Sequence, residues 1–209
     1  MKTEIIKIKG DWEEVVNDCR ATVKKPPLGH EPSNEFKRRI LIAEHDPIRD
    51  IIVKFRWPNI PYWIAMHFKT HIWRGRTNSQ RNDRQAQYDR TKAPQDAPID
   101  FIGDVNGQHG IDTSRKRLCY QAAKDTREYW EDLKIATHEV EPEISDSWVP
   151  NCVYRCGCPE MTKCPLAQQG RGLSYWELLV EKTNGAILTD DIQLRYDIYN
   201  NIFEVTHEN

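Results

Sequence analysis

The residues with the clearest chemical potential lie between positions 67 and 84, in the sequence HFKTHIWRGRTNSQRNDR. Arginine recognises phosphate oxygens in a planar, bidentate manner, and Ser, Gln and Asn offer donors and acceptors to a base or a ribose. The stretch therefore predicts a site for a phosphorylated ligand, with these candidates: His67, His71, Arg74, Arg76, Ser79, Gln80, Arg81 and Arg84. A solvated polar loop after an ordinary surface helix would have the same composition, so this stretch alone does not distinguish a ligand site from a surface loop.

A second basic cluster, Ser114 to Arg117, lies in an amphipathic segment that runs from about Asp112 to Val140. We expect this segment to be one long helix or a helix pair, with the cluster in its first turn. The start of a helix offers unpaired N–H groups and a partial positive charge, which favour anions. Arg115 and Arg117 are therefore candidates for binding a phosphate group.

Four of the six cysteines lie close together, in the pattern Cys152-x3-Cys156-x-Cys158-x5-Cys164. Four thiolates can bind a tetrahedral zinc ion or an iron–sulfur cluster, although this spacing matches no standard metal knuckle. Ordinary thiols are the alternative, and we expect no structural disulfides. Cys119 is interpreted as a small buried residue on the inward face of a helix rather than as a nucleophile.

A helix is expected to carry the two histidines that lead into the arginine-rich loop. Asn59 can cap this helix, Pro61 suits its first turn and Gly75 suits its end. His67 and His71 are four residues apart, so both imidazoles would project from the same face.

The remaining elements are short and are separated by prolines. We expect a strand at Ile5 to Ile8, a helix around Trp12 to Val16, a helix over Asn34 to Glu44 and a strand over Ile51 to Trp57. Ser174 and Glu177 form a capping box, Gly185 ends the helix that follows, and a last helix covers roughly Asp191 to Phe203. The fold class is α+β, helix-rich, with a small antiparallel or mixed sheet in a single domain over 1–209.

Bulk composition limits the function classes. The chain has 209 residues, of which 38% are hydrophobic, and a formal net charge of −2. The chain is long enough to bury a hydrophobic core. Because the net charge is slightly negative, phosphate binding must depend on local clusters of Arg and Lys. No apolar stretch approaches the roughly 20 residues needed to cross a bilayer, and no signal peptide is visible. We therefore expect a cytoplasmic protein without a membrane partner.

Several blocks of the sequence, in this order, resemble the flavin-dependent thymidylate synthases, the ThyX family. They are similar in particular to divergent members from phages and some bacteria, which would place the protein in a host cytoplasm. The blocks are AEH at 43–45, PIR at 47–49, His67-Phe68 with His71, Ser79 to Arg84, Ala93 to Pro98, Ser114 to Cys119 and Val149 to Cys164. The resemblance covers roughly residues 30–165, and 174–209 form a helical C-terminal extension.

The resemblance implies roles for individual residues. His45 corresponds to a histidine that contacts the flavin, and His71 to the central histidine of the Arg-His-Arg signature, with His67 one turn earlier. Ser79 and Arg81 correspond to nucleotide-binding residues, with Gln80 between them. The implied cofactor-binding set is His45, His67, His71, Arg74 and Arg76. The implied substrate-binding set is Ser79, Gln80, Arg81, Arg84, Arg115 and Arg117, and the implied catalytic set is Arg81, His71 and Ser79.

The sequence also departs from the family pattern. Thr70 and Ile72 stand where the signature has its flanking arginines, and Asp146 stands where the family has a phosphate-binding arginine. An alternative alignment places Arg74-Gly75-Arg76 on the signature and loses its histidine. In the alignment we prefer, Arg74 and Arg76 compensate in charge, and the Arg115 to Arg117 cluster replaces the missing phosphate contact.

The reaction implied by the resemblance is transfer of a one-carbon unit to C5 of a pyrimidine deoxynucleotide. Reduced FAD would relay the unit from methylenetetrahydrofolate to dUMP, NADPH would reduce the flavin, and no enzyme cysteine would attack the ring. The family implies a homotetramer with its ligands at subunit interfaces. One alternative is a hydroxymethylase or a cytidine nucleotide methylase. Another, from a different class, is a zinc-containing nucleic-acid-binding module, in which the arginine loop and the 114–117 cluster hold backbone phosphates, although we do not expect a nucleic-acid partner.

Overall fold

The computed structural model describes residues 3–81, 83–84, 89, 91–164 and 172–207 of the chain. It is an α+β fold, as predicted, built on a sheet with strand order β1-β2-β4-β3 in which every pairing is antiparallel. The strands are β1 (Glu4–Lys9), β2 (Ile52–Pro61), β3 (Arg74–Thr77) and β4 (Pro98–Asn106).

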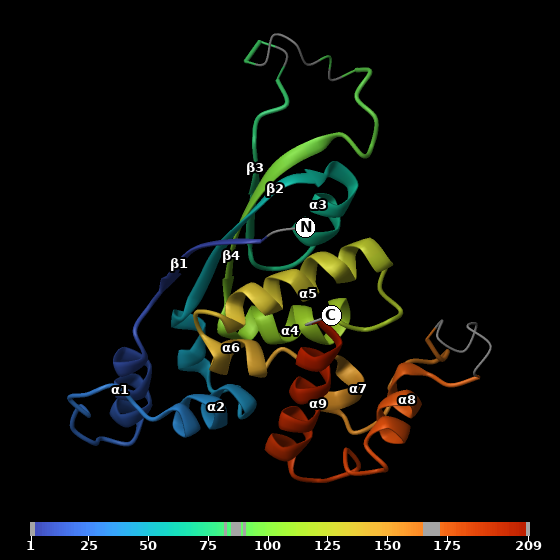
Figure 1. Cartoon of the computed structure of the whole chain (residues 1–209). Helices are drawn as coiled ribbons and strands as arrows, with labels where there is room; N and C mark the ends of the chain where they lie inside the picture. Colours follow the sequence, from blue (N-terminus) through green and yellow to red (C-terminus); the bar gives the residue numbers. More distant parts are fainter. Residues whose placement is uncertain (1–2, 82, 85–88, 90, 165–171, 208–209) are drawn as a thin grey trace.

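The helices lie between and after these strands and hold more residues than the strands do (Figure 1). In chain order, the first helices are α1 (Trp12–Thr22), α2 (Asn34–Ile42), the 3-10 helix η1 (Asp46–Asp50), α3 (Tyr62–Lys69), α4 (Gly107–Arg117) and α5 (Lys124–His138). The remaining helices are α6 (Pro142–Asp146), α7 (Asn151–Tyr154), α8 (Tyr175–Lys182) and α9 (Ile192–His207). None of the described helices has the length and apolar character needed to span a membrane.

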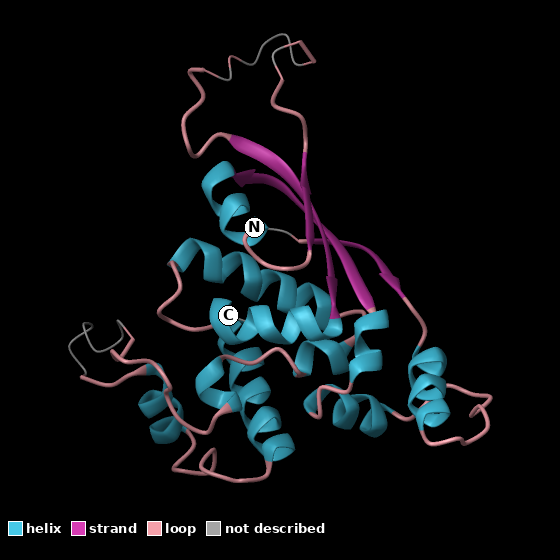
Figure 2. Ribbon diagram, turned by 180° about the vertical axis from the view of Figure 1, so that it is seen from behind, coloured by secondary structure: helices cyan, strands magenta, loops and turns pink. Residues whose placement is uncertain are grey.

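Helices cover one face of the sheet (Figure 2). Alternate residues of β2, namely Val53, Phe55 and Trp57, are buried, because successive side chains of a strand point to opposite faces. Helices α3 and α5 pack on this buried face. The other face carries ion pairs, including Arg76 to Asp104 at 2.7 Å.

Aromatic side chains fill the space between the sheet and the helices. The ring centroid of Trp57 lies 4.7 Å from that of Phe68 and 5.6 Å from that of Phe101. Gly103 of β4 makes room for this cluster, because a Cβ atom there would lie 2.3 Å from the ring of Phe55. A second apolar cluster joins α7, α8 and α9 through residues such as Val153, Leu179 and Tyr199.

The helix expected to end at Gly75 is shorter, so that prediction is wrong. Helix α3 stops at Lys69, and Gly75 lies in β3 opposite Gly103, with no room for a Cβ beside the ring of Phe101. Asn59 is not the cap either, since it lies in β2 with a φ of +53° beside the irregularity in the β2–β4 register. Pairing with β4 overrides the local helical pattern here.

The segment from Asp112 to Val140 is the helix pair, but its first helix starts earlier than expected. Asn106 caps α4 by accepting a 2.8 Å hydrogen bond from the N–H of His109. The basic cluster therefore occupies the last turn of α4, where carbonyl groups point outward, and the prediction that it lies at a helix start is wrong. Cys119 lies in the turn after α4 rather than on a helix face.

The C-terminal helices follow the sequence signals more closely. The Ser174 side chain and the Glu177 side chain form the expected capping box at the start of α8. Gly185 has a φ of +82° in the turn that follows this helix. The Asp191 carboxylate accepts hydrogen bonds from the N–H groups of Gln193 and Leu194 at the start of α9.

Candidate functional site

The structure brings His71 together with Arg117, a pairing that spans 46 residues of sequence. His71 lies in the turn between α3 and β3, and Arg117 is the last residue of α4. The Nε–H of Arg117 donates to Nε2 of His71 at 2.9 Å, and its Nη2 reaches the carbonyl oxygen of His67 at 3.5 Å. The Nδ1 atom of His67 shares a 3.0 Å hydrogen bond with the Thr126 hydroxyl of α5. Two of the predicted residues, His71 and Arg117, thus form a site where α3, α4 and α5 meet.

The electrostatics of this pair keep the histidine neutral. Burial and the adjacent Arg117 guanidinium lower the pKa of His71 to about 4. Only an unprotonated Nε2 can accept the bond from Arg117, so the geometry agrees with this direction. The ring also lies parallel to Trp73, with a centroid distance of 6.3 Å and an interplanar angle of 13°. His71 is therefore held as a neutral imidazole in a fixed orientation.

Protonation of His71 at low pH should lower the free energy of unfolding. Because its pKa is lowered from 6.5 to about 4, the unfolded chain binds more protons than the folded one between these values. The contribution of His71 to stability is thus present above pH 6.5 and is lost as pH falls toward 4. An NMR titration should give a pKa near 4 for His71, rising toward 6.5 in Arg117→Leu. The Lys69→Gln variant removes a nearby exposed cation and should leave the titration unchanged; an unchanged value in Arg117→Leu would contradict the pairing.

The arginine loop lies at the other end of β3 from His71. This loop, residues 78–97, joins β3 to β4, and its described residues next to the two strands continue past the end of the sheet (Figure 1). Arg81 is exposed, and its guanidinium donates to the Asp83 carboxylate at 2.8 and 2.6 Å. Ser79 and Gln80 are half-buried, and Arg84 is exposed. Within one chain these residues do not meet His71.

Arg74 and Arg76 lie on the polar face of the sheet. They flank the inward-facing Gly75, so both side chains point away from the aromatic core. Arg76 is engaged with Asp104, which also accepts a 3.2 Å hydrogen bond from Lys9. These two arginines therefore do not flank His71 in the way that the family signature would require.

His45 lies at a third location. It is exposed immediately before η1 and lines a groove of about 620 Å³ beside α1 and α2. The 3-10 helix η1 packs against the first residue of α4, Gly107, whereas His71 contacts the last, Arg117. An 11-residue helix is roughly 16 Å long, so His45 and His71 are well separated in one chain.

The Arg115 side chain contacts residues that the sequence analysis did not predict as its partners. It donates to the Glu44 carboxylate and stacks on the Tyr154 ring, with its guanidinium carbon 3.7 Å from the ring centroid. Gln108 donates to the same carboxylate at 2.6 Å. Glu44 has a φ of +52° and joins the end of α2 to α4. Arg115 thus holds a corner of the fold together and is half-buried.

The cysteines group differently from the sequence prediction. Cys119, Cys152, Cys158 and Cys164 line one small cavity, whereas the Cys156 thiol lies 3.8 Å from the carbonyl oxygen of Thr189. The structure therefore places three of the four predicted cysteines beside Cys119 and places Cys156 apart from them. Cys119 is 33 positions before Cys152, and the sequence pattern did not indicate this proximity.

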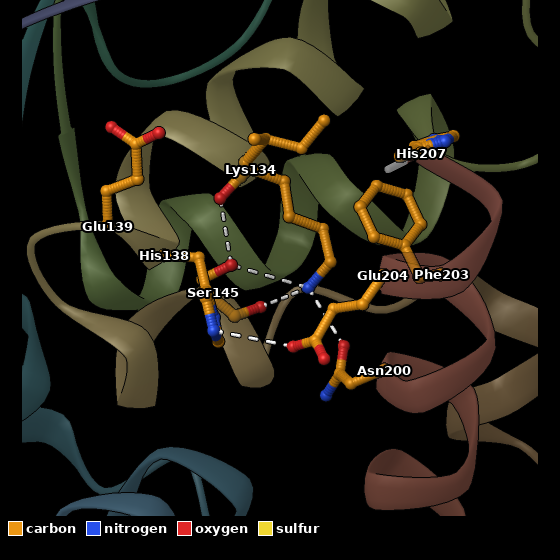
Figure 3. A pocket seen from close by; sticks show the side chains of 9 residues that line it. Lys134, His138, Glu139, Ser145, Asn200, Phe203, Glu204 and His207 are labelled. Atoms are coloured by element: carbon orange, nitrogen blue, oxygen red, sulfur yellow. Dashed lines mark hydrogen bonds and ion pairs between the residues drawn. The ribbon is translucent and has the colours of Figure 1, made fainter. Parts of the chain in front are cut away.

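A separate cavity of about 290 Å³ lies between α5, α6 and α9, and none of the predicted site residues lines it (Figure 3). The Nζ of the fully buried Lys134 donates to the Ser145 carbonyl oxygen at 2.5 Å and to Asn200 Oδ1 at 3.0 Å. Burial lowers the pKa of this amine to about 7. His138 and Glu204 lie at the rim, 3.4 Å apart. The contacts of the Lys134 amine with Ser145 and Asn200 join α5 to α6 and α9, which indicates a structural role.

The fold is that of the ThyX-like structures. ThyX from Helicobacter pylori, solved in complex with FAD and dUMP, superposes with a TM-score of 0.57 over 71% of this chain and 100% of the other, at 10% identity. The UMP/dUMP methylase PolB from Streptomyces cacaoi, solved with 5-Br dUMP, has a TM-score of 0.54 over 70% of this chain and 93% of the other, at 12% identity. No protein-family profile and no curated protein sequence matches this chain.

Proposed function

We propose that this protein is a ThyX-like nucleotide methylase that transfers a one-carbon unit to C5 of a pyrimidine deoxynucleotide, with dUMP as its substrate. The observation that carries the proposal is the fold, which two structures solved with dUMP or its 5-bromo analogue share over about 70% of this chain. Because identity is only 10–12%, the residues of this chain must supply the rest of the argument.

The dispersed positions of the predicted residues support a site built between copies of the chain. His71, the arginine loop and His45 lie at three separate places in one chain. A homotetramer can bring the exposed loop of one copy to the helices of another, since closed symmetry places different surface patches in contact. We therefore propose that ligands bind at subunit interfaces, with walls from more than one copy.

The donor set in this chain fits flat, phosphorylated ligands such as dUMP and FAD. Arg81 and Arg84 are exposed cations on the loop, with Ser79 and Gln80 beside them as neutral partners. We assign Arg81 to the pyrimidine nucleotide, with Ser79 and Gln80 contacting its base or sugar. Arg74 and Arg76 are exposed cations on β3 that can face a flavin phosphate, and we assign His45 to the flavin as well.

The histidines position the ligands and control charge. The neutral ring of His71 cannot carry the proton that an ordinary histidine would gain at mildly acidic pH, so it serves as a fixed polar contact rather than as a cation. His67 is held by Thr126 one turn earlier. FAD, when bound, would supply the redox chemistry between methylenetetrahydrofolate, NADPH and the nucleotide. The protein's own task is to orient these ligands and to stabilise charge on the pyrimidine carbonyl oxygens.

The second candidate function is a related one-carbon transfer to a different nucleotide, and the presence of Asp146 favours it. This residue stands where the family has its phosphate-binding arginine. Its carboxylate accepts a 3.1 Å hydrogen bond from Arg38 and lies 3.5 Å from His138, so it cannot serve as an anion site. A different phosphate contact could accompany a different nucleotide, such as a cytidine nucleotide, or hydroxymethylation.

The purified full chain tests both proposals. We expect a yellow protein with flavin absorption and conversion of dUMP to dTMP when methylenetetrahydrofolate and NADPH are supplied. Parallel reactions with dCMP measure the alternative acceptor, and mass analysis of the product separates methyl from hydroxymethyl. A colourless protein that gains no flavin on incubation with FAD, and that shows no turnover with either nucleotide, would overturn the proposed function.

A further inference from the structure

Four cysteines from three separate segments line one small cavity. Cys119 comes from the turn after α4, Cys152 from α7, and Cys158 and Cys164 from the segment that follows α7. The cavity measures about 20 Å³. A space of roughly 10–15 Å³ holds one water-sized sphere, so this cavity suits a single ion rather than an organic ligand.

Hydrogen bonds and ion pairs hold the surrounding backbone in place. The Gln121 amide donates to the carbonyl oxygens of Thr162 and Lys163 at 2.7 and 3.1 Å. Lys116 lies 3.6 Å from Glu160. These contacts fix the segment that carries Cys158 and Cys164 against the turn that carries Cys119.

The sulfur of Cys164 receives a hydrogen bond from the protein backbone. The N–H of Tyr175, the first residue of the eight-residue helix α8, donates to Cys164 Sγ at 3.0 Å. An N–H group at a helix start stabilises negative charge, and a thiolate is the form of cysteine that binds metals. Cys164 is therefore positioned as a metal-binding sulfur.

We propose that Cys119, Cys152, Cys158 and Cys164 bind one zinc ion. Tetrahedral zinc bound to four thiolates at about 2.3 Å places the sulfur atoms roughly 3.8 Å apart. In the described part of the chain no three His, Cys, Asp or Glu side chains are already arranged to hold a metal. Binding must therefore draw the sulfurs inward, and Cys158, the exposed member of the four, has the most freedom to move.

Cys156 is excluded from this set by its orientation. Its thiol lies 3.8 Å from the Thr189 carbonyl oxygen, and it is not among the residues that line the cavity. Its backbone has a φ of +53° in the turn after α7. Cys119 takes the fourth position instead.

The proposed zinc would stabilise the region behind the His71–Arg117 pair. Cys119 follows Arg117 by two residues, and the zinc would join this turn to α7 and to the start of α8. Metal binding would order the end of α4 and, through it, the arginine that contacts His71.

Cobalt substitution in the reduced full chain tests the proposal. We expect Co²⁺ to bind once per chain with thiolate-to-metal charge-transfer absorption, and Zn²⁺ to displace it. Cys119→Ser and Cys158→Ser should remove at least half of the charge-transfer intensity, whereas Cys156→Ser and Cys19→Ser should retain it. Cys158 is exposed, so its variant keeps the test informative if Cys119→Ser fails to fold.

Two results would overturn the assignment. One is a wild-type chain without cobalt–thiolate absorption, and the other is a Cys156→Ser variant that loses as much intensity as Cys119→Ser. Iron and acid-labile sulfide in the anaerobically purified protein would replace zinc with an iron–sulfur cluster and would equally contradict the proposal. Because metal binding is measured without turnover, this experiment is independent of the proposed methylase activity.

Discussion

Replacing Arg81 with alanine is expected to reduce nucleotide-dependent turnover at least 100-fold while leaving the fold intact. Loss of a charged hydrogen-bonding partner in a closed site costs roughly 2–5 kcal/mol, and about 1.4 kcal/mol corresponds to a factor of ten. In the free chain the Arg81 guanidinium is exposed and pairs only with Asp83 among the described residues. Exposed ion pairs contribute about 0–1 kcal/mol, so the melting temperature should barely change.

Lys92 provides a matched control in the same loop. Its side chain is 85% exposed and lies 3.6 Å from Asp89, so Lys92→Ala removes a cation with a similar acidic partner. We expect this variant to keep wild-type kcat/KM with dUMP. Equal activity in Arg81→Ala and Lys92→Ala would show that Arg81 does not contact the nucleotide, even if the enzyme is a methylase.

Lys134→Ala is expected to give the largest loss of stability. The substitution enlarges a cavity of about 290 Å³ and leaves the Ser145 carbonyl oxygen and Asn200 Oδ1 without their donor. Truncating a large buried side chain and leaving buried acceptors unpaired costs roughly 2–5 kcal/mol. For a chain of this size the melting temperature should fall by roughly 5–15 °C. Urea unfolding and thermal scans measure both quantities.

The pH dependence of the free energy of unfolding tests whether the Lys134 amine is buried in the folded state. With a pKa lowered from 10.5 to about 7, Lys134 is neutral when folded but protonated when unfolded between these values. The free energy of unfolding should therefore rise with pH from 7 toward 10.5, by at most about 1.4 kcal/mol per unit. Lys134→Met keeps most of the volume and should lack this rise.

Lys124→Ala is the control on the same helix. Its side chain is 76% exposed and pairs with Glu128 at 3.6 Å, so its loss should change stability by less than about 0.5 kcal/mol. A Lys134→Ala protein as stable as this control would mean that the amine is not enclosed between α5, α6 and α9.

Local sequence patterns determined a substantial part of this fold. Alternation of apolar residues predicted a strand at 51–57, within one residue of the observed start of β2, and Ser174 with Glu177 predicted the start of α8. These signals act over two to four residues, so they can be interpreted without the rest of the chain. The helix-rich α+β class follows from them, and the resemblance to ThyX enzymes agrees with the observed fold.

Strand β3 shows what only the tertiary structure decided. The sequence RGRT has no apolar alternation, and its strand conformation depends on pairing with β4, whose residues lie about 25 positions later. The contacts between the candidate site residues were also decided by the tertiary structure. The sequence predicted His71 and Arg117 as separate candidates, but their 2.9 Å contact joins the end of α4 to the turn after α3. The sequence grouped Cys156 with Cys152, Cys158 and Cys164 by proximity along the chain, whereas in the fold Cys119 lies beside those three. Residue types and short-range periodicity are thus determined by the sequence itself. Partners distant in sequence are determined by packing, because the free energy that brings them together comes from burying the whole core.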